Sequence, residues 1–67
     1  MTKDDFLIML RESYKKMLLN KKQTANELGI SQAGLDRLRN TGQLSSRKVL
    51  GQIMFSIDEV ARFLADA

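Results

Sequence analysis

Cysteine, histidine, proline and tryptophan are all missing from this 67-residue chain. Without cysteine it can form neither disulfides nor thiolate metal sites. Without histidine it lacks the commonest metal ligand and the side chain that titrates near neutral pH. We therefore expect no metal and no cofactor, and any catalysis would rest on carboxylates, amines or hydroxyls alone. The predicted protein is not an enzyme.

Long apolar runs are missing as well. The run from Phe6 to Leu10 is five residues long, whereas a transmembrane helix needs about 20. Acidic residues also stand where a secretory signal carries its basic region. The length allows one small domain, residues 1–67, without a large enclosed site. The expected location is the cytoplasm, without a membrane partner.

The formal net charge of +3 is small, but it is unevenly distributed. Residues 1–16 carry four bases and three acids, residues 17–55 carry six bases and two acids, and residues 56–67 carry one base and three acids. The three segments therefore have net charges of +1, +4 and −2. A basic middle segment is either a solvated face or a contact surface for an anionic partner such as nucleic acid.

An amphipathic N-terminal helix is predicted over residues 3–18, with Thr2 as its N-cap. Its apolar residues recur every three or four positions: Phe6, Leu7, Leu10, Tyr14, Met17 and Leu18. Ile8 and Met9 lie partly outside this stripe. They indicate either ordinary packing or a surface for self-association.

Two short helices joined by a tight turn are predicted over residues 20–40. Asn20 and Gln23 have capping-box spacing, Gly29 favours a left-handed helix end, and Ser31 can cap the second helix. The apolar residues between the helices agree in register: Ala25, Leu28, Ile30, Leu35 and Leu38. The pattern is typical of a helix-turn-helix, whose second helix enters the DNA major groove. A plain helical hairpin is the alternative.

An alternating pattern after Gly42 predicts a β-hairpin over residues 44–55, with Leu50 and Gly51 at its turn. Because a lone hairpin is marginal in water, it must pack on the helices and leave its basic tip outward, as a wing does. Ser56 and Glu59 then form a capping box that begins a last helix over residues 56–66. Its expected inward stripe is Ile57, Val60, Ala61 and Leu64, and its expected outer face is acidic and points away from DNA: Asp58, Glu59 and Asp66.

Residues 18–66 resemble the winged helix-turn-helix of the excisionase and MerR-like superfamily. The resemblance is carried by the leucine pair at 18–19, the helix-turn-helix pattern, TGQL at 41–44, the basic strand, Gly51, and a Ser-x-x-Glu-Val helix start at 56–60. The implied fold is mainly α with a small β-hairpin, a winged helix-turn-helix with an extra N-terminal helix. Small members of this superfamily act as excisionases, also called recombination directionality factors, or as transcriptional regulators of prophages and other mobile elements.

The resemblance implies a sequence-specific double-stranded DNA-binding protein, associated with the nucleoid, that acts as an accessory factor for excision, with an integrase or recombinase as a further partner. A small transcriptional regulator of the same fold is one alternative. A protein-interaction module with a basic face is another, from a different class of protein.

The residues predicted to contact DNA fall into two groups. Outward positions on the second helix of the helix-turn-helix are candidates for base readout: Gln32, Ala33, Asp36, Arg37 and Asn40. Residues at helix starts, on a flank or on the wing are candidates for backbone or wing contacts: Lys21, Lys22, Ser31, Arg39, Arg47, Lys48 and Gln52. An acid at 36 departs from the superfamily pattern, and either accepts from a cytosine or orients Arg37.

Overall fold

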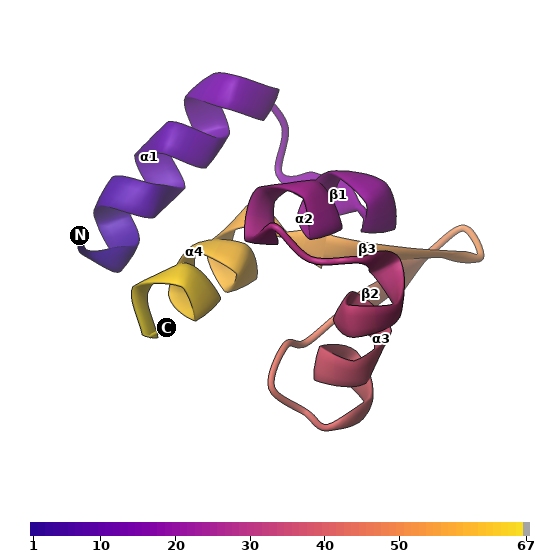
Figure 1. The fold of residues 1–67 in the computed structure, drawn as a ribbon. Helices are drawn as coiled ribbons and strands as arrows, with labels where there is room; N and C mark the ends of the chain where they lie inside the picture. Colours follow the sequence, from indigo (N-terminus) through magenta and orange to yellow (C-terminus); the bar gives the residue numbers. More distant parts are fainter. Residues whose placement is uncertain (67) are drawn as a thin grey trace.

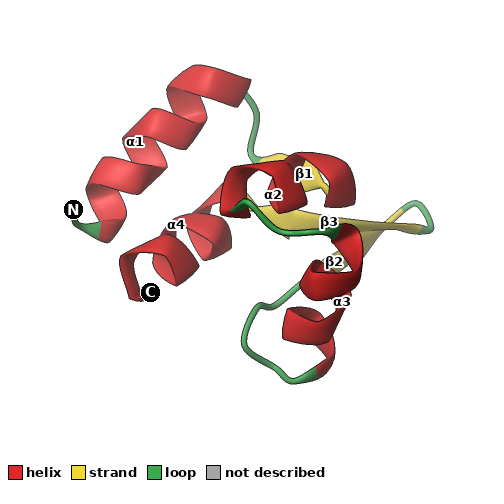
Figure 2. Cartoon of the chain, in the orientation of Figure 1, coloured by secondary structure: helices red, strands yellow, loops and turns green. Residues whose placement is uncertain are grey.

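Four helices and a small three-stranded antiparallel sheet make up residues 1–66, the part of the chain that the computed structural model describes (Figures 1 and 2). The elements are α1 (Lys3–Tyr14), β1 (Leu18–Asn20), α2 (Lys21–Leu28), α3 (Gln32–Asn40), β2 (Arg47–Val49), β3 (Gln52–Ser56) and α4 (Ile57–Asp66). The mainly helical class is as predicted. The sheet has one more strand than the predicted hairpin, and its strand order is β1-β3-β2.

Helix α1 begins as expected and ends earlier than expected. Thr2 accepts a hydrogen bond from the Asp5 backbone N–H, and the Asp5 carboxylate accepts one from the Thr2 N–H, which completes a capping box. The helix ends at Tyr14 because Lys15 adopts a left-handed conformation with φ 55° and donates its N–H to the Arg11 carbonyl. The predicted extension to residue 18 is therefore wrong.

The segment that was predicted to continue α1 is instead the edge strand β1. Leu19 pairs with Phe55 of β3, and both side chains are fully buried. Met17, predicted to lie in the apolar stripe of the helix, is exposed, and its carbonyl accepts from the Ile57 N–H at 2.9 Å. The apolar spacing of residues 14–18 suits a helix, but pairing with β3 satisfies the backbone groups and buries Leu19 at the same time.

Helices α2 and α3 have the predicted ends. Asn20 and Gln23 form the capping box of α2, Gly29 ends it with φ 69°, and Ser31 accepts from the Gly34 N–H to cap α3. Ala25 and Leu35 are buried where the two helices meet. Ile30 was expected in the same interior, but 37% of it is exposed.

The segment between α3 and β2 is a loop held by α4, where the sequence predicted the first residues of a strand. The Arg62 guanidinium donates to the Gln43 carbonyl at 2.9 Å, and the Glu59 carboxylate accepts from the Ser45 N–H at 2.9 Å. Leu44, between these two contacts, is fully buried. Ser56 does cap α4 through the Glu59 N–H, but the Glu59 side chain holds the loop instead of completing the predicted capping box.

Strands β2 and β3 form a hairpin with a two-residue loop at the predicted turn. Val49 pairs with Gln52, and between them Leu50 and Gly51 have φ values of 51° and 81°. Two successive positive φ values are the requirement of a type I′ turn, whose twist matches that of the flanking strands. The hairpin projects away from the helices at its tip (Figure 1).

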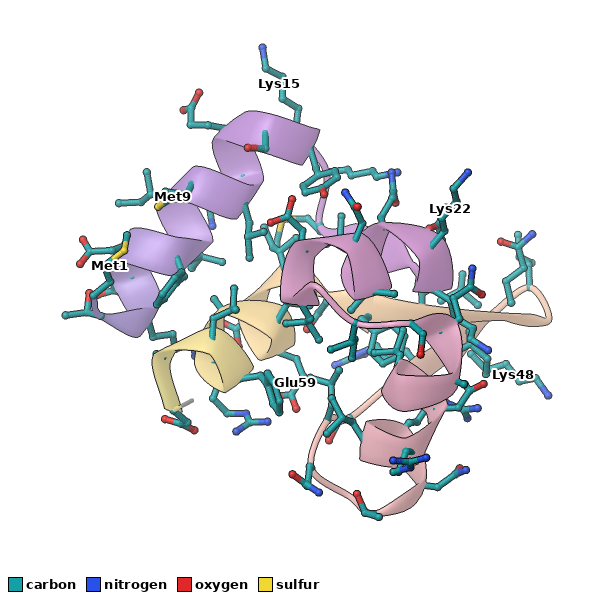
Figure 3. All side chains as sticks on the ribbon, in the orientation of Figure 1. Met1, Met9, Lys15, Lys22, Lys48 and Glu59 are labelled. Atoms are coloured by element: carbon teal, nitrogen blue, oxygen red, sulfur yellow. The ribbon has the colours of Figure 1, made fainter. Side chains whose placement is uncertain are left out.

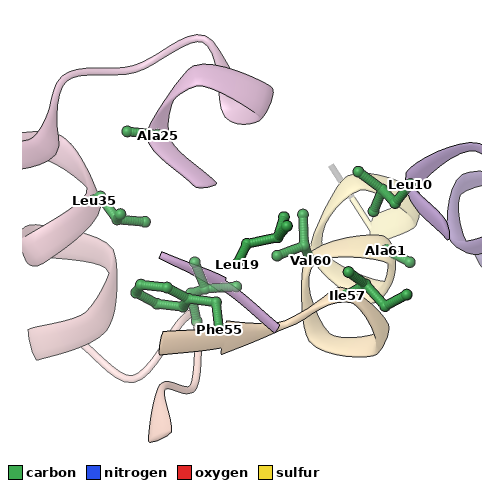
Figure 4. Close-up of a cluster of buried hydrophobic side chains, with 9 residues drawn as sticks. Leu10, Leu19, Ala25, Leu35, Phe55, Ile57, Val60 and Ala61 are labelled. Atoms are coloured by element: carbon green, nitrogen blue, oxygen red, sulfur yellow. The ribbon is translucent and has the colours of Figure 1, made fainter. Parts of the chain in front are cut away.

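One buried cluster joins the four helices to the sheet (Figure 4). Phe55 lies at its centre on β3, between Leu35 of α3 and the residues of α4. The cluster consists of Leu10, Leu19, Ala25, Leu35, Leu44, Phe55, Ile57, Val60 and Ala61. The inward stripe predicted for α4 is confirmed at Ile57, Val60 and Ala61, whereas Leu64 is half-buried at the edge of the cluster.

Helix α1 packs on α4 on the side of the molecule opposite to the hairpin (Figure 1). An ion pair between Lys3 and Asp58, 3.1 Å from Nζ to Oδ1, joins the two helices. The other face of α1 leaves Ile8 and Met9 exposed. Helix α1 is therefore part of the core through Leu10, and it also presents an apolar outer face.

Tyr14 joins the end of α1 to α2, because its hydroxyl donates to the Glu27 carboxylate. Burial, this hydrogen bond and the Glu27 charge together raise the pKa of Tyr14 to about 12. All three causes disfavour the charged phenolate.

We expect a high alkaline titration midpoint for Tyr14. It is the only tyrosine in a chain without tryptophan, so ultraviolet absorbance of the phenolate reports on it alone. The folded pKa of about 12 exceeds an unfolded value of about 10. The contribution of protonated Tyr14 to the stability of the folded state is therefore complete below a pH of about 10, and it is lost as the pH rises towards 12. Glu27→Gln should lower the midpoint, whereas Glu12→Gln should leave it unchanged. Equal midpoints in wild type and Glu27→Gln would contradict the contact.

Candidate nucleic-acid interface

Helix α3 and the β2–β3 hairpin lie away from α1 (Figure 1). The labelled side chains show the same division, because Lys22 and Lys48 lie on the side of the hairpin, and Met1 and Met9 lie on α1 (Figure 3). We call the exposed surface of α2, α3 and the hairpin the basic face. It is defined by Lys22, Gln32, Arg37, Asn40, Arg47 and Lys48, all of them exposed.

The outer side of α3 carries most of the side chains predicted to read bases. Gln32, Arg37 and Asn40 are exposed, and Ala33 beside Gln32 is exposed too. Leu35 is fully buried on the opposite side of this helix, and Leu38 is half-buried. Amide and guanidinium groups match the donor and acceptor patterns of adenine and guanine edges. The helix therefore presents suitable groups to solvent with its apolar side held in the core.

Asp36 is the one predicted base-reading residue of this helix that is not free, because its carboxylate pairs with two basic side chains of the protein. Its Oδ1 lies 2.8 Å from Lys21 Nζ and 3.1 Å from Arg39 Nη2. These contacts, the hydrogen bond from Lys21 first, hold the pKa of Asp36 below its usual value. Asp36 is therefore an anion at neutral pH, and it orients Lys21 and Arg39. The sequence had suggested that it orients Arg37.

The ion pairs of Asp36 change the expectation for Lys21 and Arg39. Both were predicted to contact phosphates, but both are half-buried and share one carboxylate, which compensates one of their two charges. The Arg39 Nε is also buried, without a hydrogen-bond partner among residues 1–66. The cluster of Lys21, Asp36 and Arg39 thus pins α3 to the start of α2.

The remaining cations of this surface have no ion pair among residues 1–66: Lys22, Arg37, Arg47 and Lys48. Arg47 and Lys48 are both exposed on β2. Residues 37–57 contain four bases and no acid, and within the described chain only Arg39 of the four has an ion pair, with Asp36. The hairpin and the second half of α3 therefore carry uncompensated positive charge.

Four predicted contact residues lie at or near the start of a helix or strand: Lys22, Ser31, Gln32 and Gln52. Lys22 and Gln32 line the same open depression between α2 and the start of α3. Ser31 uses its hydroxyl oxygen to cap α3, and Gln52 is exposed at the start of β3. The acids of α4 do not form a free outer face, because Asp58 pairs with Lys3, and Glu59 and Asp66 pair with Arg62.

Sequence reasoning missed the role of Arg62. Its guanidinium holds the Gln43 carbonyl and two carboxylates, and it lowers the pKa of Glu59, which is then ionised to accept from Ser45. The i, i+3 and i, i+4 spacing of Arg62 to Glu59 and Asp66 is readable from the sequence. Its contact with the 41–46 loop is not, because 19 residues separate Arg62 from Gln43. This loop connects the candidate reading helix to the hairpin.

No known protein family, no curated protein and no solved structure matches the chain. Within residues 1–66, no helix is long and apolar enough to cross a membrane. The same residues contain no cluster of three or more acidic side chains placed to hold a metal ion.

Proposed function

We propose that the protein binds double-stranded DNA sequence-specifically as a winged helix-turn-helix, with α3 in the major groove and the β2–β3 hairpin as the wing. The observation that carries the proposal is the basic face. It combines exposed amide and guanidinium side chains on one short helix with unpaired cations on an adjacent hairpin. Base readout needs the first kind of group and backbone contact needs the second.

The dimensions of α3 suit this use. An α-helix with its side chains is about 10–12 Å in diameter, which the major groove of B-DNA, about 12 Å wide, admits. The nine residues of α3, at about 1.5 Å per residue, would extend about 14 Å inside it. The α1–α4 side supports this arrangement because it is not basic overall: residues 1–16 and 57–66 together carry five bases and six acids. Arg37 and Asn40 are then the candidates for reading guanine and adenine, and Lys22, Arg47 and Lys48 for holding phosphates.

The biological setting of this binding follows from the resemblance of residues 18–66 to excisionases. An accessory role in excision of a mobile element is the first proposal, with a recombinase as the second partner. Transcriptional regulation through the same surface is the alternative. An integrase-catalysed excision reaction separates the two, because only an excision factor changes the yield of product when it is added.

The DNA-binding proposal is tested by adding a short duplex to the ¹⁵N-labelled protein and following its amide signals. We expect the largest shifts in residues 31–41 and 46–52, because these ranges contain α3 and the hairpin. Amides of α1 serve as the internal control, and they should move little. Shifts concentrated on α1 and α4, or none at low salt, would contradict the proposal and favour a protein-interaction module.

A further inference from the structure

Leu50, at the tip of the hairpin, is the most exposed large apolar residue of the described chain. Its side chain is 99% exposed, so it contributes nothing to the core. It also has a φ of 51°, in the left-handed region that a leucine rarely adopts. The first position of a type I′ turn favours Asn, Asp or Gly. Leucine is thus unfavourable here for the backbone and for hydration, and the fold gains no packing from it.

The surroundings of Leu50 indicate the chemistry of a partner. Arg47 and Lys48 are exposed on the preceding strand, and Gly51 follows as a residue without a side chain. The nearest acid along the chain on either side is Asp36 or Asp58. The tip is therefore one fully exposed leucine, next to Val49 at 38% exposure, on a narrow cationic ribbon. A stable protein interface needs about 800 Å² from each partner, much more than one leucine provides.

We propose that Leu50 inserts between adjacent base pairs in the minor groove and kinks the duplex. Proteins that bend DNA through the minor groove insert apolar side chains, leucine among them, between base steps and unstack them. Arg47 and Lys48 would contact the flanking phosphates while the leucine enters the stack. This inference rests on the proposed DNA binding, and it assigns one residue to the deformation of the DNA.

Insertion at the tip also implies a sequence preference that needs no hydrogen bond. Pyrimidine–purine steps such as TA and CA unstack most easily, so a wedge favours them. We expect a site selected from random duplexes to contain such a step where the wing meets the DNA. That position would be preferred although no polar side chain reads it.

The test compares wild type with Leu50→Asn, measuring the bend of a bound duplex by energy transfer between dyes at its ends. Asn followed by Gly is a favoured type I′ pair, so the variant keeps the hairpin and should unfold at no lower temperature than wild type. We expect wild type to bend its site by about 20–90°. Leu50→Asn should still bind, with the same salt dependence, but should leave the duplex close to straight. Leu50→Met should retain most of the bend.

Met9→Gln is the matched control, because it removes an exposed apolar side chain from α1, on the opposite side. It should bend DNA as wild type does. Equal bends for wild type and Leu50→Asn would overturn the wedge, and so would a straight duplex in the wild-type complex. Loss of self-association in Leu50→Asn with an unchanged bend would assign the tip to a protein contact instead. Failure of wild type to bind any duplex would refute the proposed function itself, which is a separate result.

Discussion

Arg37→Ala should lose most of the discrimination between a selected DNA site and random duplex. Arg37 is exposed on α3 and has no ion pair among residues 1–66, so its guanidinium is available to a base edge. A bidentate contact with guanine contributes about 1–3 kcal/mol of discrimination. The ratio of specific to random affinity should therefore fall by roughly fivefold to 150-fold. Fluorescence anisotropy on both duplexes measures this ratio.

Lys48→Ala provides the contrast on the same face. Lys48 lies on the hairpin, where a phosphate contact is expected, so the variant should bind specific and random DNA more weakly by the same factor. Lys16→Ala removes an exposed cation next to α1 and should change neither affinity. If Arg37→Ala weakened both duplexes equally, Arg37 would hold phosphate and another residue of α3 would read the site.

Asp36→Asn should bind random DNA more tightly than wild type does. In wild type the carboxylate pairs with both Lys21 and Arg39, at 2.8 and 3.1 Å, so its neutralisation would release both cations to the phosphates. Two additional phosphate contacts would make the slope of log affinity against log salt steeper by about 1.8. The cost in folding stability should be small, because partly exposed ion pairs contribute about 0.2–1 kcal/mol each.

Asp58→Asn is the matched control for Asp36→Asn. It makes the same change in net charge on α4, where Asp58 pairs with Lys3. It should leave the salt slope unchanged. Weaker binding of all duplexes by Asp36→Asn, with Asp58→Asn unchanged, would mean that Asp36 positions Lys21 and Arg39 for DNA instead of withholding them.

Local signals in the sequence predicted most of the helix ends and the turn. The Asn20–Gln23 capping box, the Gly29 helix end and the Ser31 cap all depend on residues within a few positions of one another. Such short-range hydrogen bonds dominate the choice of helix ends. The Leu50–Gly51 turn was likewise predicted from nearby residues, because the apolar residues on both sides of it alternate as in a strand.

The errors in the sequence prediction lie where distant segments compete with a local pattern. Met17 and Leu18 continue the helical spacing of α1, yet Leu18–Asn20 is a strand that pairs with β3. Leu19 and Phe55, which pair there, are 36 residues apart in the sequence. Ser45 was predicted to lie in the hairpin, but α4 holds it in a loop through Glu59, and Arg62 holds the neighbouring Gln43. A periodic pattern does not report which distant partner a segment meets.

In the candidate interface, too, local features could be predicted from the sequence and contacts between elements could not. A helical wheel predicted the outward side chains of α3, since the buried position of Leu35 fixes the orientation of the helix. It did not predict that Asp36 faces Lys21, because their contact depends on how α2 and α3 cross. The set of free cations, on which the DNA-binding proposal depends, could therefore be obtained only from the three-dimensional arrangement.

The most direct test of DNA binding by the basic face is the salt dependence of duplex affinity for the wild-type protein. Lys22, Arg47 and Lys48 are the three cations assigned to phosphates, and each phosphate contact contributes about −0.9 to the slope of log affinity against log salt. We therefore predict a straight line with a slope of about −2.7. An affinity that does not change with salt, or no binding at low salt, would contradict the assignment of this face to DNA.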